Sequence, residues 1–414
     1  MHDHDKTAAT ASPVMSERRV SLLGAMLIAI GPLSMALYTP AMPQIVEFFG
    51  TSEAAVKMTL SLYFAGFAVA QLFCGPLSDG LGRKPVTLAF MAVYAAASLL
   101  AVLAPTIEVL IVARFLQGVG AAVGIAVSRA LVRDLFTHEQ SARIMNLMGI
   151  ILAIGPALAP TIGGLTMEFA GWHAIFLIML ASGFLVTIVV QLAMRETVSR
   201  DLARIRPRGL ARAYGTLLAS PYFMTSSLVV AGSVGAMYTQ ATVLPFILME
   251  RVGLSPSQFG VGMLMQSGMF FAGSVSVRFL MRRTSAYRLV PVGLGFIALG
   301  STLLAYGLNA APPSFLRVMG PVAFYAYGIA FVMPAMMTAS LAPFPHMAGA
   351  ASALAGFMQM GGGLLGGSVA ALIGEPVFAM SVVIPAMGAS AILSWILWRG
   401  LPEPAQAVRL PEKA

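Results

Sequence analysis

Twelve apolar stretches, each long enough to cross a membrane, are the feature that most limits how this chain can fold. A membrane-spanning helix needs about 20 mainly apolar residues. The stretches are continuous rather than alternating, so they predict helices and not the strands of a barrel. The sequence therefore predicts an all-α membrane protein with twelve transmembrane helices. The predicted helices cover residues 21–40, 55–77, 85–104, 107–131, 144–166, 172–194, 221–248, 258–281, 289–306, 315–337, 347–373 and 377–398.

The composition agrees with a chain that lies mostly in lipid. Hydrophobic residues make up 58% of the sequence and charged residues 10%, whereas a soluble domain carries about 25% charged residues. The single cysteine, Cys74, excludes a disulfide within the chain, and the five scattered histidines predict no metal site. No catalytic constellation or phosphate-binding loop appears, so we expect neither an enzyme nor direct use of ATP, and no cofactor.

Lysine and arginine divide unequally between the predicted loops. If the N-terminus is cytoplasmic, 21 of the 25 Lys and Arg fall in inner segments, three in outer ones (Lys57, Arg251, Arg317), and Arg114 lies within a span. Such a bias sets the orientation of membrane proteins, so we expect both termini in the cytoplasm. The net charge of +9 is then explained by contact with anionic lipid rather than with nucleic acid.

The longest inner loop divides six predicted helices from six and holds six arginines. This division predicts an internal repeat, of which the sequence keeps only a weak trace. Gly75, Asp79, Arg83 and Lys84 have the same spacing as Ser274, Arg278, Arg282 and Arg283. The predicted organisation is a tail over 1–20, a first bundle over 21–194, a basic linker over 195–220, a second bundle over 221–398 and a tail over 399–414.

The segment GPLSDGLGRKP, residues 75–85, carries the most specific signal. It predicts a tight turn between two membrane helices, with the acid near a helix N-terminus and the bases paired with acids or lipid phosphates. A cluster that pairs in one state and separates in another is a cytoplasmic gate. The alternative is an ordinary basic loop that only sets topology. The predicted gate residues are Gly75, Asp79, Gly82, Arg83 and Lys84.

This segment resembles the signature loop between helices 2 and 3 of the major facilitator superfamily, whose members have two six-helix bundles around a central cavity. RFLQGVG at 114–120 resembles the helix 4 motif of that superfamily, and APTIGG at 159–164 resembles its helix 5 antiporter motif. The segments YTPAMP (38–43), QLFCGPLSD (71–79) and GWHAIF (171–176) resemble the bicyclomycin and chloramphenicol resistance (Bcr/CflA) family of multidrug efflux pumps.

Arg114 lies about seven residues into a predicted helix, where an arginine costs roughly 2.5–3.5 kcal/mol. Such residues usually face a cavity or a partner, although backbone carbonyls can also satisfy them. Gln117 lies one turn further on the same face. We predict that Arg114, with Gln117 and Tyr38 nearby, binds substrate. Softer candidates, which local packing would also explain, are Tyr63, Tyr238, Gln240, Gln266 and Tyr325.

One departure from the family concerns the proton. Ala36 stands where many relatives carry an aspartate that cooperates with the helix 4 arginine, and no acid lies in the middle of any predicted span. An acid restored at position 36 is expected to pair with Arg114 if the two side chains can meet. The helix 5 motif predicts a bent, closely packed helix, which the resemblance implies seals the route against leak. Its residues are Gly155, Pro156, Pro160, Gly163 and Gly164.

The resemblance implies a secondary active transporter that exports small amphipathic or polar compounds, including drugs, by alternating access and proton antiport. We expect a monomer in the bacterial inner membrane, whose partners are a small-molecule substrate, protons and membrane lipid. One alternative is an exporter of a specific metabolite, such as an amino acid, a sugar or a siderophore. Another is a membrane receptor that transports nothing.

Overall fold

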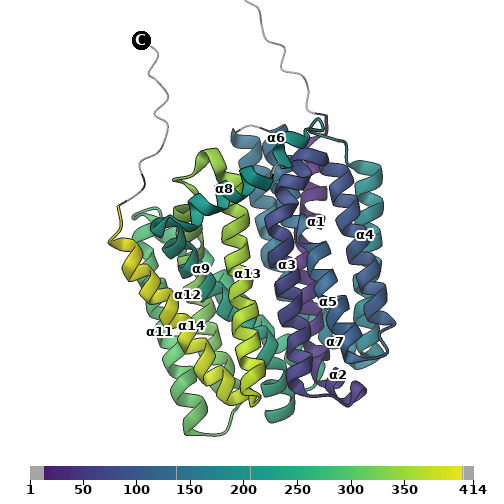
Figure 1. Cartoon of the computed structure of the whole chain (residues 1–414). Helices are drawn as coiled ribbons and strands as arrows, with labels where there is room; N and C mark the ends of the chain where they lie inside the picture. Colours follow the sequence, from purple (N-terminus) through teal and green to yellow (C-terminus); the bar gives the residue numbers. More distant parts are fainter. Residues whose placement is uncertain (1–13, 137, 206, 403, 405–414) are drawn as a thin grey trace, which may run out of the picture.

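The computed structural model describes residues 14–136, 138–205, 207–402 and 404, without the side chains of residues 138, 139, 142, 146, 149–154, 156, 203 and 204. The described chain consists of helices joined by short turns (Figure 1). In chain order these are α1 (Glu17–Tyr38), η1 (Thr39–Ala41), α2 (Met42–Phe49), α3 (Glu53–Leu81), α4 (Arg83–Val102), α5 (Ile107–Ala121), α6 (Val123–Leu135), α7 (His138–Ala193), η2 (Leu202–Ile205), α8 (Pro207–Leu218), α9 (Pro221–Pro245), η3 (Phe246–Arg251), α10 (Pro256–Leu280), α11 (Ala286–Ala310), α12 (Phe315–Leu341), η4 (Pro345–Met347), α13 (Ala348–Ile373) and α14 (Pro376–Arg399).

Serine and proline fix where several of these helices begin. The side chains of Ser52 and Ser220 accept hydrogen bonds from backbone N–H groups in the first turns of α3 and α9. At α10, Ser255 and Gln258 form a reciprocal capping box, and Pro256 takes the first helical position. These side chains satisfy N–H groups that have no partner within the helix, and proline has no N–H to satisfy. The local signals place these three helix starts within a few residues of the predicted limits.

Eleven described stretches are long and apolar enough to cross a membrane. One of them belongs to α7, which consists of two helices joined at Gly171, where a φ of 74° interrupts the helical backbone. With α7 counted as two helices, the prediction of an all-α membrane protein with twelve spans is confirmed. Two predicted spans are less regular than expected, because α5 is followed directly by α6 and α9 ends in the π-helical turn η3.

The membrane helices pack around two apolar cores. We call residues 14–194 the N-terminal half and residues 221–399 the C-terminal half; they form the purple-to-blue and the green-to-yellow groups of helices in Figure 1. All buried members of the first core come from the N-terminal half except Phe246. All buried members of the second core come from the C-terminal half. Each half therefore packs mainly on itself.

Two pairs of helices make the most extensive contacts between the halves: α3 with α13, and α7 with α10. Glycines let the second pair approach closely, since a Cβ at Gly164 would lie 2.1 Å from the Pro256 carbonyl oxygen and one at Gly260 would lie 2.4 Å from the Pro160 carbonyl oxygen. The Thr161 hydroxyl also donates a hydrogen bond to the Gly260 carbonyl at 3.0 Å. Such contacts at small residues are a common way for membrane helices to associate.

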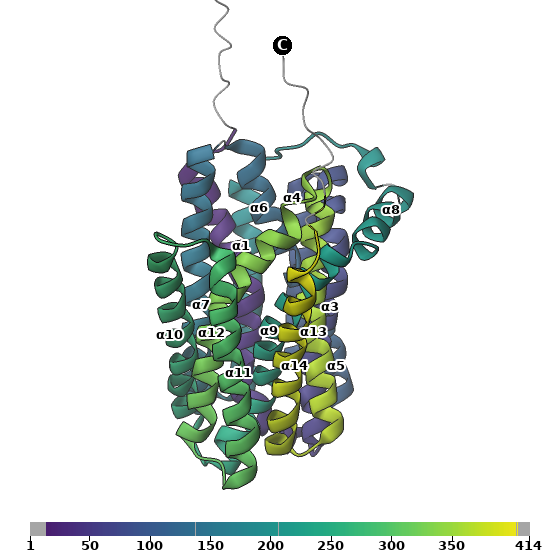
Figure 2. The same cartoon turned by 90° about the vertical axis from the view of Figure 1, so that its left-hand side faces the viewer.

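The segment between the halves differs from the plain loop that the sequence predicted. It contains η2 and the helix α8, which contacts α13 and reaches α3 through a hydrogen bond from the Tyr214 hydroxyl to the Leu72 carbonyl oxygen at 2.6 Å (Figures 1 and 2). Leu217 of α8 is buried in a small apolar core beside Phe223. A helix with one apolar and one basic face suits a membrane surface, and the sequence analysis overlooked it because it is too short to span.

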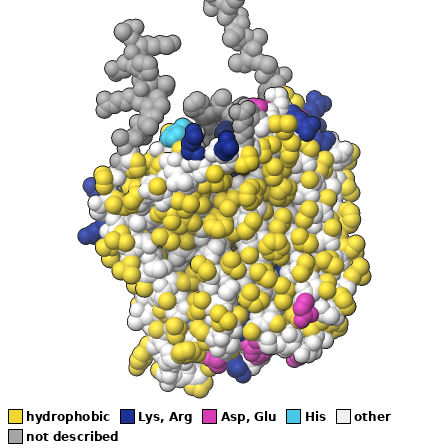
Figure 3. All heavy atoms as spheres, viewed as in Figure 1, with side chains coloured by type: hydrophobic (Ala, Val, Ile, Leu, Met, Phe, Trp, Pro, Cys, Tyr) yellow, Lys and Arg dark blue, Asp and Glu magenta, His cyan; other side chains and the backbone are white. Residues whose placement is uncertain are grey.

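Charge is distributed along the long axis of the molecule. We call its two ends the α8 end and the α2 end, after the short helices that they carry (Figure 1). Lysine and arginine gather mainly at the α8 end, and a wide hydrophobic band separates them from acidic side chains at the α2 end (Figure 3). The band is the surface that a lipid bilayer would cover.

Candidate functional site

Arg114 lies on α5, in the core of the N-terminal half, and is fully buried. Its guanidinium carbon lies 4.3 Å from the ring centre of Tyr38 on α1, 4.5 Å from that of Tyr63 on α3 and 6.0 Å from that of Phe176 on α7. The faces of aromatic rings attract cations. Three helices therefore surround one charge with aromatic rings, and we call this group, together with Gln117, the arginine cage.

Polar groups contact the edge of the guanidinium. Arg114 donates from Nη1 to Gln117 Oε1 at 2.7 Å and from Nη2 to the Ser34 carbonyl oxygen at 3.4 Å. Gln117 in turn donates to Ser98 Oγ at 2.8 Å. Arg114 Nε is the guanidinium nitrogen without a hydrogen-bond partner among the described residues. A buried donor without an acceptor is costly, so this edge would gain most from an additional acceptor.

No described carboxylate forms an ion pair with Arg114. Ser34 and Tyr38, four residues apart on α1, both contact the guanidinium and so share one helix face. Ala36 lies between them, on the opposite face of α1. An acid at position 36 would therefore point away from Arg114. The condition for such an acid to pair with the arginine, that the two side chains can meet, is therefore not met in this structure.

The predicted site residues of the C-terminal half do not share one set of contacts. Tyr238 comes nearest to the cage: its hydroxyl accepts a hydrogen bond from Gln359 Nε2 at 3.0 Å, and its ring centre lies 5.2 Å from that of Phe64 on α3. Gln266 Nε2 donates to Gln240 Oε1 at 2.8 Å, and the buried Tyr325 hydroxyl points to the Gly232 carbonyl at 3.4 Å. The last two pairs fit local packing, the alternative that the sequence left open.

Three contributors to the arginine cage and its hydrogen bonds were not singled out from the sequence. Phe176 ends the GWHAIF segment and carried no signal beyond that resemblance. Ser34 contributes its main-chain carbonyl, which no residue pattern reveals. Ser98 reaches Gln117 only because α4 packs against α5. Each of these contacts depends on how helices distant in sequence lie against each other.

The predicted gate segment is mostly helical. The helix α3 continues through Leu81, so Asp79 lies in its last turn and not near a helix N-terminus, which corrects the prediction. Only Gly82, with a φ of 109°, separates α3 from α4. A negative charge at the C-terminal end of a helix is unfavourable. The ion pair between Asp79 and Arg83 offsets this charge.

Arg83 connects the ends of three helices at the α8 end. Its side chain is buried and pairs with Asp79 of α3 and with Asp134 of α6, where Nε donates to Oδ2 at 3.0 Å. Nη1 also donates to Ser78 Oγ at 2.7 Å. Asp134 was not among the gate residues predicted from the sequence. An arginine with two acids can retain one partner while it releases the other.

Glu196, which follows α7, caps the start of α4. Its carboxylate accepts hydrogen bonds from the backbone N–H groups of Arg83 at 2.8 Å and Lys84 at 3.1 Å, while Lys84 Nζ donates to a main-chain oxygen of α7 at 2.7 Å. A Cβ at Gly82 would lie 2.6 Å from the Glu196 carboxylate, whereas a Cβ at Gly75 would meet nothing within 4 Å. The φ of 109° therefore favours glycine at position 82, where a Cβ would also displace the Glu196 carboxylate, whereas packing leaves room for a side chain at position 75.

The helix 5 motif lies on α7, where it contacts both α1 and α10. A Cβ at Gly163 would lie 2.4 Å from a main-chain oxygen of α1, and Gly164 and the Pro160 carbonyl meet α10 at the close contacts described above. Gly155 makes only ordinary van der Waals contact, at 3.9 Å from a side chain of α1. The side chain of Pro156 lies outside the described residues. The motif thus supplies one of the two most extensive contacts between the halves.

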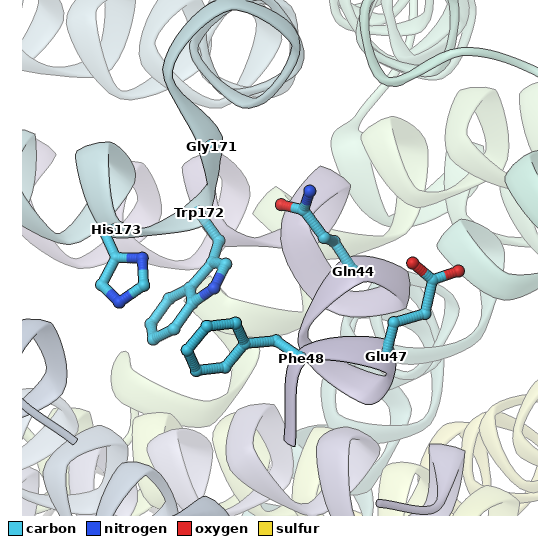
Figure 4. Close-up of a pocket in the computed structure, with 6 residues that line it drawn as sticks. All are labelled: Gln44, Glu47, Phe48, Gly171, Trp172 and His173. Atoms are coloured by element: carbon cyan, nitrogen blue, oxygen red, sulfur yellow. The ribbon is translucent and has the colours of Figure 1, made fainter. Parts of the chain in front are cut away.

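A pocket of about 450 Å³ opens at the α2 end. None of its lining residues belongs to the arginine cage, but Trp172 meets Phe176 of the cage edge-on, with 5.9 Å between ring centres. Trp172 stacks on His173 with 3.6 Å between ring centres, and Phe48 meets the Trp172 ring edge-on at 5.1 Å (Figure 4). Because the pocket lies beside α2 at the rim of the N-terminal half, it does not connect the predicted substrate residues. Its walls are formed by Gln44, Glu47, Phe48, Gly171, Trp172 and His173.

Comparison with known proteins gives consistent matches over most of the chain. The profile of the Major Facilitator Superfamily matches residues 24–367. The chain is 31% identical to the uncharacterized MFS-type transporter YdgK of Bacillus subtilis (strain 168), over 88% of this chain and 90% of that protein. It is 30% identical to the multidrug resistance protein MdtL of Salmonella typhimurium, over 92% of this chain and 94% of that protein.

A solved structure shares the arrangement of helices. It is that of a bacterial homologue of the human lysosomal transporter Spinster, in an inward-facing and unoccupied conformation. The two structures superpose with a TM-score of 0.68 at 17% sequence identity, over 92% of this chain and 95% of that one. At this identity the likeness concerns the fold alone.

Proposed function

Because this chain belongs to the Major Facilitator Superfamily, we propose that it is a secondary active efflux transporter that exports small amphipathic or polar compounds, drugs among them, by alternating access. The names of the MdtL relatives as multidrug resistance proteins support efflux. Within the superfamily we assign the chain to the Bcr/CflA family, on the segments at 38–43, 71–79 and 171–176.

The observation that carries this proposal is the arginine cage. A guanidinium is buried in a membrane helix against aromatic rings. Among the described residues it has no carboxylate partner, and one of its N–H groups has no acceptor. Ionisable residues inside the membrane usually mark a substrate or ion path. Arginine recognises planar oxygen acceptors such as carboxylates and phosphates, and aromatic rings accept amphipathic ligands. We therefore infer that Arg114 meets a polar acceptor of the substrate when the cage opens to the space between the halves.

We further propose that the α8 end faces the cytoplasm of a bacterial inner membrane. The gathering of lysine and arginine at that end supports this orientation (Figure 3), which leaves both termini and the linker 195–220 in the cytoplasm. On this view the bundles 21–194 and 221–398 rock against each other in a single monomer. The cluster of Asp79, Arg83 and Asp134 is then the cytoplasmic gate.

Proton antiport is our proposed energy source, with a carrier other than a helix 1 acid. Each charge that crosses a potential of 100 mV supplies about 2.3 kcal/mol. The uncompensated charge of Arg114 favours a second candidate within the same class, the export of one anionic metabolite. A broad exporter would accept compounds with and without an acidic group, whereas a metabolite exporter would accept only the acidic ones.

Transport into inverted membrane vesicles tests these proposals. We expect accumulation of a chemically varied compound panel that requires a pH gradient and stops when an ionophore collapses it. Vesicles from cells that lack this protein are the control for uptake by other proteins. Accumulation that survives collapse of the gradient would contradict proton antiport. A panel in which nothing accumulates above the level of the control vesicles would contradict efflux.

A further inference from the structure

Lys57 is a buried base at the α2 end that the proposed function does not use. The sequence analysis counted it among the outer loop residues, but the structure places it in the first turns of α3 and fully buried. A buried ammonium group is costly unless its N–H groups find acceptors. Its partners therefore indicate why the base is present.

Lys57 connects the two halves of the protein. Its Nζ donates to Glu53 Oε2 of the same helix at 2.9 Å and to the Gly374 carbonyl oxygen of the C-terminal half, also at 2.9 Å. It also lies 4.9 Å from the ring centre of Phe246, which belongs to the C-terminal half. The side chain of Glu250 also interacts with Glu53 and Lys57. The ammonium group thus has one hydrogen-bond acceptor on α3 and one at the end of α13.

Gly374 is well suited to receive this charge. It follows the last residue of α13, with a φ of 81° that ends the helix. Carbonyl oxygens at the C-terminus of a helix carry a partial negative charge because the last four have no partner within the helix. A cation placed there is stabilised only while α3 and α13 lie together. The contact therefore favours closure of the halves at the α2 end.

A corresponding contact lies at the opposite end of the same pair of helices. Tyr214 of α8 donates its hydroxyl to the Leu72 carbonyl of α3 at 2.6 Å, while Leu217 of α8 packs in the core that contains Leu354 of α13. Burial raises the pKa of Tyr214 to about 12, so the hydroxyl keeps its proton and stays a donor. This contact favours closure of the halves at the α8 end.

We propose that Lys57 and Tyr214 are opposing latches of the α3–α13 interface: Lys57 holds the α2 end closed and Tyr214 holds the α8 end closed. Lys57 donates directly to a main-chain oxygen of the other half, whereas Tyr214 donates to α3 from the linker helix α8, which packs on α13. Both bonds are formed in this structure. If the halves rock as the proposed function requires, opening at either end breaks one latch and leaves the other. The two residues thus position the halves and set which side the substrate site faces.

Distance measurements on the full chain in lipid nanodiscs test this proposal. Spin labels are placed at exposed positions, Gln44→Cys with Ala310→Cys at the α2 end and Ser199→Cys with Ser285→Cys at the α8 end. The background is Cys74→Ala, which removes the single cysteine. Pulsed electron resonance then reports the fraction of molecules that are open at each end.

We expect the two latch variants to act in opposite directions. Lys57→Met should raise the open-to-closed ratio at the α2 end roughly tenfold or more, because a charged hydrogen bond is lost. Tyr214→Phe should raise the ratio at the α8 end by about two- to tenfold, because a neutral bond is lost. Lys57→Arg, which keeps a donor, should restore most of the closed population at the α2 end.

Matched controls separate latching from general loosening. Tyr327→Phe removes a hydroxyl that donates to Ser276 within the C-terminal half at 2.9 Å, and Arg317→Met removes a base of the α2 end that donates to the Pro312 carbonyl. Neither control should change either distance. The proposal would be overturned if each latch variant lengthened the distances at both ends. It would also be overturned if a latch variant left the distance at its own end unchanged.

The outcome is separable from that of the proposed function, because the distances are measured without transport. Opposite shifts in a protein that exports nothing would keep the latches and reject efflux. Normal export with unchanged distances would reject the latches alone.

Discussion

The two halves of this protein differ in their buried cores and in the turns that they carry at the α8 end. In the core, the N-terminal half holds a buried arginine, whereas the C-terminal half holds the neutral pair Gln240–Gln266. At the α8 end, the turn between α3 and α4 joins Arg83 to two acids. The turn after α10 carries Arg282 and Arg283 exposed and, among the described residues, without an ion pair.

The difference indicates a division of work between the halves. A buried charge in a membrane protein is costly, so a half that retains one uses it, while neutral polar pairs can serve packing alone. On this argument the N-terminal half recognises the substrate and operates the gate at the α8 end. The C-terminal half provides the opposing surface, through α10 and α13. The comparison fails if changes in the C-terminal half impair transport as strongly as matched changes in the N-terminal half.

The largest effect is expected at Arg114. Arg114→Ala should abolish nearly all transport and weaken substrate binding at least about tenfold, since a charged donor is lost. Arg114→Lys keeps the charge but not the planar fork, so its loss should be greatest for compounds with carboxylate, phosphate or nitro groups. Substrate titration by calorimetry and efflux assays measure both effects.

The matched change in the C-terminal half is Tyr325→Phe. It removes a buried hydroxyl whose contact with the Gly232 carbonyl is long, at 3.4 Å, so efflux should stay within about twofold of the parent. If Arg114→Ala binds and exports like the parent, the arginine is structural. If Tyr325→Phe is as harmful as Arg114→Ala, the division between the halves is wrong.

The second effect concerns the gate at the α8 end. Asp79→Asn removes one of the two acids that pair with Arg83. Loss of one charge-assisted bond should slow efflux roughly tenfold while expression stays normal. Arg278→Gln, at the corresponding position of α10, is the control and should change the rate little. If Asp79→Asn and the parent export at equal rates, at equal protein levels in the membrane, residues 75–85 only set the topology and do not form a gate.

A smaller effect is expected where the halves meet through α7 and α10. Gly164→Ala would bring a Cβ to 2.1 Å from the Pro256 carbonyl oxygen, so backbone must shift. Overpacking of this kind costs about 1–3 kcal/mol. Thermal unfolding of the purified protein should occur at a lower temperature, and efflux should fall several-fold. Gly268→Ala on α10, where a Cβ meets nothing within 4 Å, should leave the unfolding temperature and the efflux rate unchanged. If Gly268→Ala lowers them as much as Gly164→Ala does, the loss comes from replacing a helical glycine and not from the close contact between α7 and α10.

Much of the fold could be predicted because it depends on local properties of the chain. The length of the apolar stretches predicted the membrane-spanning helices. Serine and proline caps determine where helices such as α9 and α10 begin. The helix α8 was overlooked, since an amphipathic segment of 12 residues resembles a basic loop. The extension of α3 through Leu81 was also overlooked, because glycine at 80 suggested a turn although neighbouring packing keeps it helical.

The site was less predictable because its contacts join distant segments. Spacing on one helix placed Gln117 beside Arg114 correctly, at 2.7 Å. No spacing could show that Arg83 pairs with Asp134 or that Lys57 is buried against Gly374. Helix spacing alone places Ala36 on the face of α1 opposite to Ser34 and Tyr38. Only the structure shows that Ser34 and Tyr38 face Arg114, and so that Ala36 faces away from it.

The smallest effect is expected for the amide pair of the C-terminal half, and it gives the finest test of the comparison. Gln266→Leu leaves Gln240 buried without its partner, and Gln240 Nε2 already has no described acceptor. Interhelical hydrogen bonds in membranes are worth about 0.6 kcal/mol on average, so the melting temperature should fall slightly. The double variant Gln240→Met, Gln266→Leu replaces both partners by apolar groups and should recover the loss. If the pair serves packing alone, efflux of every compound in the panel stays within about twofold in both variants. The contrary result is that the double variant regains its stability but exports a different set of compounds. That result would show that the C-terminal half contacts the substrate, and the proposed division of work would be wrong.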